Sequence, residues 1–257
     1  MEIAVLPTAQ DIAREAADRV GALMNASPNA VLGLATGSSP VALYQELGRR
    51  HREEGLSFAQ SRAFLLDEYV GLPLDHPEAY RNVIRREFTS LVDIPDSEVN
   101  SPSGTAPDLN ASCVEYENAI KAAGGIDLQI LGVGQNGHIG FNEPASALTS
   151  RTRVTTLTEE TREVNARFFD SVDEVPKHVV TQGLGTIMEA REIIFIAKGA
   201  NKAEAVAQLV EGPISTFWPV TVLQNHQNVT VYIDEPAAAG LKLRDYYEHM
   251  YRNRPER

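Results

Sequence analysis

The sequence predicts an α/β protein built on one doubly wound, mostly parallel sheet. Short runs of branched apolar residues recur along the chain, and segments with apolar residues at helical spacing lie between them. Such runs are typical of buried strands, and such segments are typical of amphipathic helices. Strands that alternate with helices form a parallel sheet covered on both faces. Several runs also end at glycines and polar side chains, which favours a binding site at one edge of that sheet.

The chain length fits a single domain that spans residues 1–257. Hydrophobic residues make up 43% of the chain, which is enough for a substantial core. We find no internal repeat, no low-complexity tract and no convincing interdomain linker.

The N-terminal part begins the alternation. After a short strand at 3–6, Thr8 is a typical N-cap for a helix, and Asp11 lies in the first turn of that helix. The strand at 30–34 leads into a turn of small residues and then a second helix. Pro40 fits the first position of this helix, where its missing N–H costs nothing.

The rest of the chain continues the pattern. A strand at 63–66 ends on Asp67, and residues 90–110 lack periodicity and read as a connection. The other expected elements are helices at 80–88 and 113–122, a strand at 126–133, a helical segment at 158–169, the end of a helix at 187–191, a strand at 192–197, a helix through Lys202, Val206 and Leu209, a strand at 229–233 and a helical tail from 241.

Composition limits the possible functions. The net charge of −12 argues against a general nucleic-acid or anionic-membrane binder. It leaves room for a small anionic ligand, because a few local basic groups and amides can hold one. The single cysteine, Cys113, and the dispersed histidines provide no disulfide framework and no spacing typical of a metal site. With no secretion signal and no run of membrane-spanning length, we expect a soluble cytoplasmic protein.

The stretch IDLQILGVGQNGHIGFNEP at 126–144 is the first candidate site. Its strand stops at glycines, which places polar side chains at the carboxyl edge of the sheet. His138 is the natural acid/base candidate because its unperturbed pKa lies near neutral. Asn136 and Glu143 are close enough in sequence to orient it. The alternative is a polar turn with a surface histidine.

A second candidate is the turn ATGSSP, in which Thr36, Gly37, Ser38 and Ser39 link a strand to a helix. Backbone N–H groups in such a turn, with the positive end of a helix behind them, favour a phosphate. The turn lacks both the GK[ST] of a P-loop and the dinucleotide fingerprint GxGxxG, so nothing here requires ATP or NAD. The alternative is an ordinary strand-to-helix turn.

Three charged residues complete the candidates. Asp67 follows a strand, so its carboxylate lies at the same sheet edge as His138. Arg167 and Lys202 lie on expected helices and could bind a phosphate. Each residue also has an ordinary explanation: a capping or turn acid for Asp67, and solvated surface cations for Arg167 and Lys202.

Three separate segments together resemble the glucosamine-6-phosphate deaminase family: LGLATGSSP at 32–40, LLDEYVGL at 65–72 and GVGQNGHIGFNEP at 132–144. The segments SRTRVTTLT at 150–158 and NARFF at 165–169 extend the similarity to nearly the whole chain. The resemblance implies a modified Rossmann-like fold. It also implies the conversion of glucosamine 6-phosphate and water into fructose 6-phosphate and ammonia, with no redox cofactor and no metal.

The resemblance also implies roles for the candidate residues. His138 matches the histidine that opens the sugar ring, and Glu143 matches its acidic partner. Asp67 matches the base that moves a proton from C2 to C1. The turn at 36–39, Arg167 and Lys202 would hold the phosphate of a small-molecule sugar phosphate. A homo-oligomer is left open.

Two positions depart from some family members. Asn136 replaces an aspartate that completes a triad with the histidine and glutamate in some members, whereas other members also carry asparagine. An asparagine can orient an imidazole but cannot stabilise its cation by charge. Thr155 stands where allosterically activated members carry a lysine that binds the effector N-acetylglucosamine 6-phosphate, although Arg153 is present. We therefore expect weak or absent allosteric activation.

Two other functions are compatible with parts of the pattern. A 6-phosphogluconolactonase would use a related phosphate turn and a histidine in a similar loop, but LLDEYVG and GHIGFNEP favour the deaminase. A sugar-phosphate-sensing regulator would bind without turnover. Such regulators usually add a DNA-binding helical domain, for which this chain has neither extra length nor a basic segment.

Overall fold

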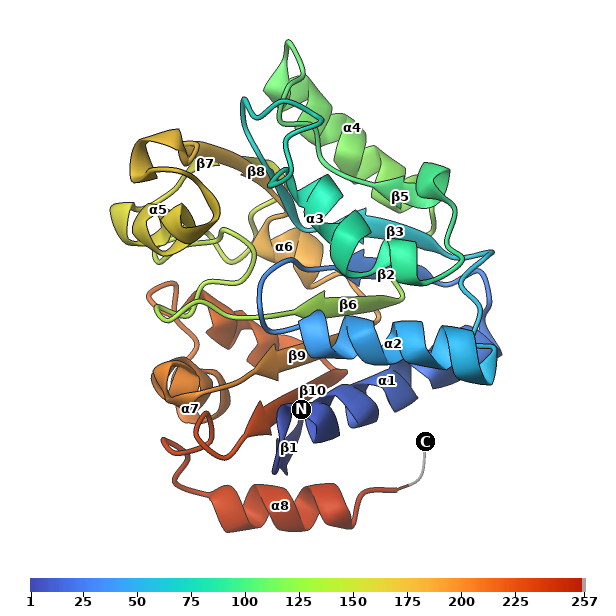
Figure 1. The fold of residues 1–257 in the computed structure, drawn as a ribbon. Coiled ribbons are helices and arrows are strands. Elements are labelled where there is room, and N and C mark those ends of the chain that lie inside the picture. Colours follow the sequence, from blue (N-terminus) through green and yellow to red (C-terminus); the bar gives the residue numbers. More distant parts are fainter. Residues whose placement is uncertain (256–257) are drawn as a thin grey trace.

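The computed structural model describes residues 1–255, which contain a seven-stranded and a three-stranded sheet (Figure 1). The larger sheet is parallel throughout, in the order β1-β10-β9-β6-β2-β3-β5. Its strands are β1 (Glu2–Leu6), β2 (Val31–Leu34), β3 (Arg62–Leu65), β5 (Val99–Asn100), β6 (Leu128–Leu131), β9 (Glu192–Ala197) and β10 (Val229–Asp234). The predicted doubly wound, mostly parallel α/β class is confirmed.

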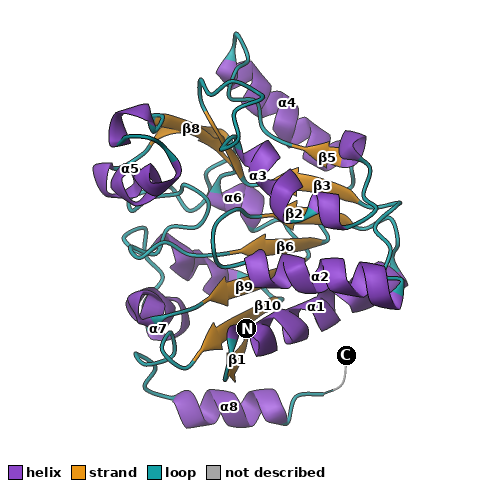
Figure 2. Cartoon of the chain, viewed as in Figure 1, coloured by secondary structure: helices purple, strands orange, loops and turns teal. Residues whose placement is uncertain are grey.

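Helices cover both faces of this sheet (Figure 2). Strand β9 shows why, because its side chains alternate between two apolar cores: Ile194 and Ile196 pack with α1 and α2, whereas Ile193 and Phe195 pack with α4, α6 and α7. The helices are α1 (Ala9–Ala26), α2 (Val41–Glu54), α3 (Tyr80–Glu87), α4 (Leu109–Ala122), α5 (Glu159–Asn165), α6 (Leu184–Ile187), α7 (Ala203–Glu211) and α8 (Arg244–Arg252). No helix within residues 1–255 is long and apolar enough to cross a membrane.

A small antiparallel sheet lies beyond the carboxyl ends of the central strands. It consists of β4 (Asp67–Tyr69), β8 (His178–Thr181) and β7 (Arg153–Thr156), with β8 in the middle. Only Leu66 separates the end of β3 from the start of β4, and Asp67 pairs with Thr181 of β8. This second sheet fixes the backbone at Asp67 independently of the main sheet.

The chain order creates a switch point between β2 and β6. From β2 the chain runs outward on one side through β3 and β5, then returns to β6 and continues on the other side through β9 and β10. Ligands of open α/β sheets bind in the crevice outside the carboxyl ends of the strands at such a point. The polar turns that follow β2 and β6 both lie there.

The six strands predicted in the main sheet are all confirmed, with small shifts at their ends. Thr8 is the N-cap of α1, and its side chain accepts a hydrogen bond from the Asp11 backbone N–H, as predicted. Pro40 was predicted at the first helical position, but it lies one residue earlier, at the N-cap position of α2. Its carbonyl oxygen accepts a hydrogen bond from the backbone N–H of Tyr44.

Four strands escaped prediction, namely β4, β5, β7 and β8. They are two to four residues long. Arg167 and Lys202 were expected on helices. Both lie in short 3₁₀ helices, one directly after α5 and one directly before α7.

Candidate active site

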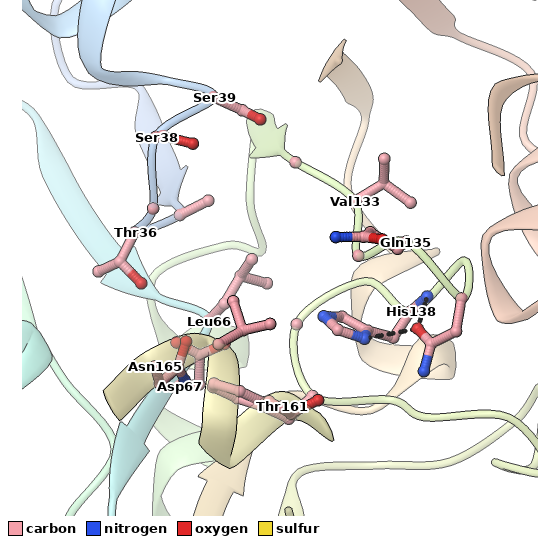
Figure 3. A pocket seen from close by; sticks show the side chains of 18 of the residues that line it. Thr36, Ser38, Ser39, Leu66, Asp67, Val133, Gln135, His138, Thr161 and Asn165 are labelled. Atoms are coloured by element: carbon pink, nitrogen blue, oxygen red, sulfur yellow. Dashed lines mark hydrogen bonds between the residues drawn. The ribbon is translucent and has the colours of Figure 1, made fainter. Parts of the chain in front are cut away.

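A cavity of about 210 Å³ opens at the switch point (Figure 3). Its walls come from the turn after β2, from Asp67, from the glycine-rich loop after β6, from one side of α5 and from Lys202. All ten residues proposed from the sequence lie in or beside this cavity, and all but Glu143 line it. Segments separated by more than 160 residues therefore form one site, as expected from the shared sheet edge.

The loop after β6 holds His138 in a fixed position. The imidazole Nδ1 lies 2.7 Å from the Oδ1 of Asn136, and the Asn136 Nδ2 donates to the Oε2 of Glu143 over 2.6 Å. The ring also lies directly over Gly134, where an added Cβ would come within 2.2 Å of it. Glycine is therefore required at this position to leave room for the imidazole.

This chain of contacts determines the tautomer of His138. A carboxylate only accepts hydrogen bonds, so Asn136 must turn its NH₂ towards Glu143 and its carbonyl oxygen towards the imidazole. The carbonyl oxygen accepts only from a donor, so Nδ1 carries the proton. In the neutral imidazole with this tautomer, Nε2 has the lone pair that a general base requires.

Glu143 supports the imidazole from behind. Its Oε2 lies 3.4 Å from the His138 Nδ1, and its Oε1 accepts from the Thr161 hydroxyl over 2.8 Å. Burial alone would raise the pKa of this carboxyl. The nearby imidazole of His138 and the hydrogen bonds from Thr161 and Asn136 hold the pKa at about 2 instead. Glu143 is therefore a fixed negative charge at neutral pH.

Asp67 has the opposite environment. Its side chain is buried, and within residues 1–255 no hydrogen-bond donor reaches its carboxyl group. Burial, and then repulsion from neighbouring Glu68, raise the pKa of Asp67 to about 8. A carboxyl group with such a pKa can both take up and return a proton near neutral pH.

The capping role that the sequence offered as an alternative for Asp67 belongs to its neighbour Glu68. Its carboxylate accepts from the backbone N–H groups of Tyr80 and Arg81 over 2.9 and 3.1 Å, so it caps the first turn of α3. The pair is therefore divided: Glu68 is the structural capping acid, whereas Asp67 faces the cavity.

The turn after β2 forms the opposite wall, and Figure 3 shows Thr36 and Ser38 across the cavity from His138. Gly37 has a φ of 96°, which favours glycine. A contact from outside the turn also holds Ser38 in place, because its carbonyl oxygen accepts a hydrogen bond from the Lys198 Nζ over 3.1 Å. The conformation of Gly37 and the contact with Lys198 therefore hold this turn in place at the start of α2.

Two cations complete this wall. Arg167 and Lys202 both line the cavity, and within residues 1–255 neither has an acidic partner. Burial and then the charge of Arg167 lower the pKa of Lys202, so the two cations lie close together. Two cations without an acidic partner beside a strand-to-helix turn are an arrangement that can attract an anion, although Arg167 itself is exposed.

Sequence reasoning missed several contributors. Thr161, Asn165 and Glu160 lie on α5, and Lys198 follows β9. A pattern could have indicated those on α5, because residues 160, 161, 164 and 165 share one side of a helix. Nothing in the sequence indicated Lys198. No group of three or more His, Cys, Asp or Glu side chains in the described part of the chain is arranged to hold a metal ion.

Comparison with protein families identifies the group to which this arrangement belongs. Residues 7–232 match the model of the glucosamine-6-phosphate isomerases/6-phosphogluconolactonases. The chain belongs to this family. A family relative from Arthrobacter sp. (strain FB24), named glucosamine-6-phosphate deaminase, is 56% identical over 255 residues, which cover 99% of this chain and 98% of the relative.

Solved structures of the family show the same architecture. A monomeric glucosamine-6-phosphate deaminase is 42% identical, with a TM-score of 0.91, and the match covers 94% of this chain and all of that one. A 6-phosphogluconolactonase from Trypanosoma brucei is 22% identical with a TM-score of 0.73, and the match covers 93% of this chain and 98% of that one. The second similarity shows the shared fold alone.

Proposed function

We propose that this chain is a glucosamine-6-phosphate deaminase, which converts glucosamine 6-phosphate and water into fructose 6-phosphate and ammonia. The observation that carries the proposal is the pairing of two acid/base groups with one anion site. Asp67, which is mostly uncharged at neutral pH, and His138 face a cavity whose other wall carries Arg167 and Lys202. The curated relatives, at 53 to 57% identity over nearly the whole chain, bear this name.

The anion site anchors the substrate. The phosphate binds to the backbone N–H groups of the turn at 36–39 and to Arg167 and Lys202. A phosphate dianion satisfies both unpaired cations, and charge-assisted hydrogen bonds of this kind are stronger than neutral ones. With the phosphate fixed, the sugar carbons extend towards Asp67 and His138.

Ring opening is the task of His138. Its Nε2 takes the proton from the hydroxyl on C1, and the ring oxygen gains a proton as its bond to C1 breaks, which leaves an open-chain aldehyde. The imidazole passes through a cation in this step. Asn136 orients the ring and Glu143 supplies the only negative charge in contact with it within residues 1–255.

Isomerisation is the task of Asp67. In its ionised form it removes the proton from C2, and the electrons move to give an enolamine. The carboxyl then returns a proton to C1, so that C2 becomes an iminium carbon. Water adds to C2 and ammonia leaves, which gives the ketone of fructose 6-phosphate. The pKa of about 8 suits Asp67 to both proton transfers.

The buried carboxyl also separates this function from lactone hydrolysis. A 6-phosphogluconolactonase needs an acid/base for one water molecule, and a histidine in the loop after β6 would suffice. Asp67 is a second group with a raised pKa, and within residues 1–255 no hydrogen-bond donor reaches it. Such a group is expected in an enzyme that moves a C–H proton, which lactone hydrolysis does not require. We also propose that the enzyme acts in the cytoplasm.

The test is a product assay on the purified chain. Glucosamine 6-phosphate should give ammonia and fructose 6-phosphate in equal amounts, without added metal or nicotinamide cofactor. 6-Phosphogluconolactone should be hydrolysed no faster than in buffer. Lactone hydrolysis without ammonia release would overturn the proposal, and so would tight binding of glucosamine 6-phosphate without any turnover, which is the behaviour of a sensor.

A further inference from the structure

Helix α5 and the turn after it present one continuous row of side chains to the cavity. The members of the row are Glu160, Thr161, Val164, Asn165 and Arg167. The pairs 160 and 164 and 161 and 165 are each four residues apart, so these four side chains share one side of α5, and Arg167 follows three residues after Val164. The row starts with an acid and ends with a base, about 10 Å apart along the axis.

Contacts with the rest of the site orient this row. At its first end, the Thr161 hydroxyl donates to Glu143 over 2.8 Å, beside His138. At its last end, Arg167 lies close enough to Lys202 to depress the pKa of that lysine. Glu160 therefore belongs to the end where the sugar carbons react, and Arg167 belongs to the end where the phosphate binds.

Glu160 differs from the other acid in the cavity wall. Within residues 1–255, Asp67 and Glu160 are the two carboxyl groups that line the cavity. Asp67, with its pKa of about 8, is mostly uncharged at neutral pH. Glu160 is exposed, and none of the described cations pairs with it. A cationic group of the substrate would find its partner at Glu160.

We propose that Glu160 pairs with the ammonium group of the bound amino sugar, so that α5 selects 2-amino sugar phosphates over sugar phosphates without an amine. The proposal rests on the proposed function, because it assigns a partner to the second charge of that substrate. Glucosamine 6-phosphate carries a phosphate at one end and an ammonium group near the other. The acid-to-base order along α5 matches these two charges, and such complementarity mainly provides specificity.

The first turn of α5 offers a simpler explanation for an acid. Negative side chains near a helix N-terminus are stabilising, and both Glu159 and Glu160 lie there. Glu159 does not line the cavity, although it has the same charge and is also exposed. It is therefore a matched control: an effect on the helix alone would appear in both variants.

Two inert ligands isolate the ammonium group. 2-Amino-2-deoxyglucitol 6-phosphate and glucitol 6-phosphate are open-chain compounds that cannot isomerise, and they differ only at C2, which carries an amine in the first and a hydroxyl in the second. Calorimetry on the wild type should show tighter binding of the amino compound at neutral pH. In Glu160→Gln we expect the affinity for the amino compound to fall about two- to five-fold, the range of an exposed ion pair. The affinity for glucitol 6-phosphate should stay unchanged.

Glu159→Gln should leave both affinities unchanged, and added salt should shrink the wild-type preference. The proposal is overturned if Glu160→Gln keeps the full preference, or if it weakens both ligands equally, since that result would indicate a role in positioning α5. Failure of the proposed function is a separate outcome, because it would appear as absence of ammonia release by the wild type.

Discussion

The imidazole Nδ1 of His138 lies 2.7 Å from the Oδ1 of Asn136, so an uncharged amide stands between the histidine and the acid behind it. The amide fixes the tautomer of His138 by accepting from Nδ1 while donating to Glu143. It contributes no charge of its own. Asn136 therefore orients the imidazole, and within residues 1–255 Glu143 is the acid that can support its cation.

This division predicts the effect of Asn136→Asp. A second carboxylate beside the imidazole favours its protonated form, so the histidine-dependent limb of the profile of kcat/KM against pH should move to higher pH, by about one pH unit or more. Glu143 would lose the donor at 2.6 Å and face a like charge, so its pKa should rise from about 2. A well-folded variant with an unshifted limb would show that Asn136 does not orient His138 and is only a turn residue.

Asp67→Asn should separate chemistry from folding. The amide has the shape of the carboxyl group and cannot take a proton from C2, so turnover should fall by roughly two to four orders of magnitude. Binding of glucitol 6-phosphate should persist, because the phosphate is held at the other wall. Near-normal ammonia release by this variant would remove Asp67 from the mechanism.

The same variant carries a prediction on stability. The pKa of Asp67 rises from 3.8 to about 8 on folding, so the folded state disfavours the charged form. Because the unfolded state loses this proton near pH 4 and the folded state only near pH 8, the free energy of unfolding falls as the pH rises between these values. The total loss is on the order of a few kcal/mol. Asp67→Asn removes this loss, so its free energy of unfolding relative to wild type should increase between pH 4 and 8. Chemical denaturation at several pH values measures it, and parallel curves would contradict the assigned burial.

Arg167→Ala and Lys202→Ala should act mainly on binding. Each removes one charged hydrogen bond to phosphate, typically about 1.5–3 kcal/mol, so KM should rise roughly ten- to a hundred-fold while kcat changes less. Lys177→Ala removes an exposed lysine that does not line the cavity and serves as a control. Unchanged affinity for glucosamine 6-phosphate in both single variants would place the phosphate elsewhere.

The sequence was a good guide wherever a pattern was local. Six of the seven strands of the main sheet are apolar runs, and most of the site residues follow those strands, so the sheet edge predicted their meeting. Lys198 and Thr161 act through contacts with Ser38 and Glu143 that are distant in sequence, and no local pattern encodes such pairs. The two neighbouring acids show the same limit, because only burial and partners distinguish Glu68 from Asp67.

Regulation by N-acetylglucosamine 6-phosphate is predicted to be weak or absent. Thr155 adds no charge to β7, and Arg153 is already engaged, since it donates to the Asn142 Oδ1 over 2.8 Å and to the Ser146 hydroxyl over 3.2 Å. An effector activates only if it binds two states with different affinity, and one cation fewer reduces that difference. Initial rates should follow a hyperbola with and without the effector. Sigmoidal rates that become hyperbolic on its addition would contradict this prediction.

Gly134→Ala tests whether the position of His138 depends on the glycine beneath it. A Cβ at this position would come within 2.2 Å of Cε1 and 2.4 Å of both ring nitrogens, so the imidazole must move away from Asn136. We expect kcat to fall about a hundred-fold or more, the scale of a lost acid/base, with little change in the binding of glucitol 6-phosphate. Gly132→Ala is the contrast, because its Cβ would press on Ser39 at 3.3 Å in the phosphate turn, so it should raise KM instead. If both variants changed the same kinetic constant, the two walls of the cavity would not have the separate roles assigned to them.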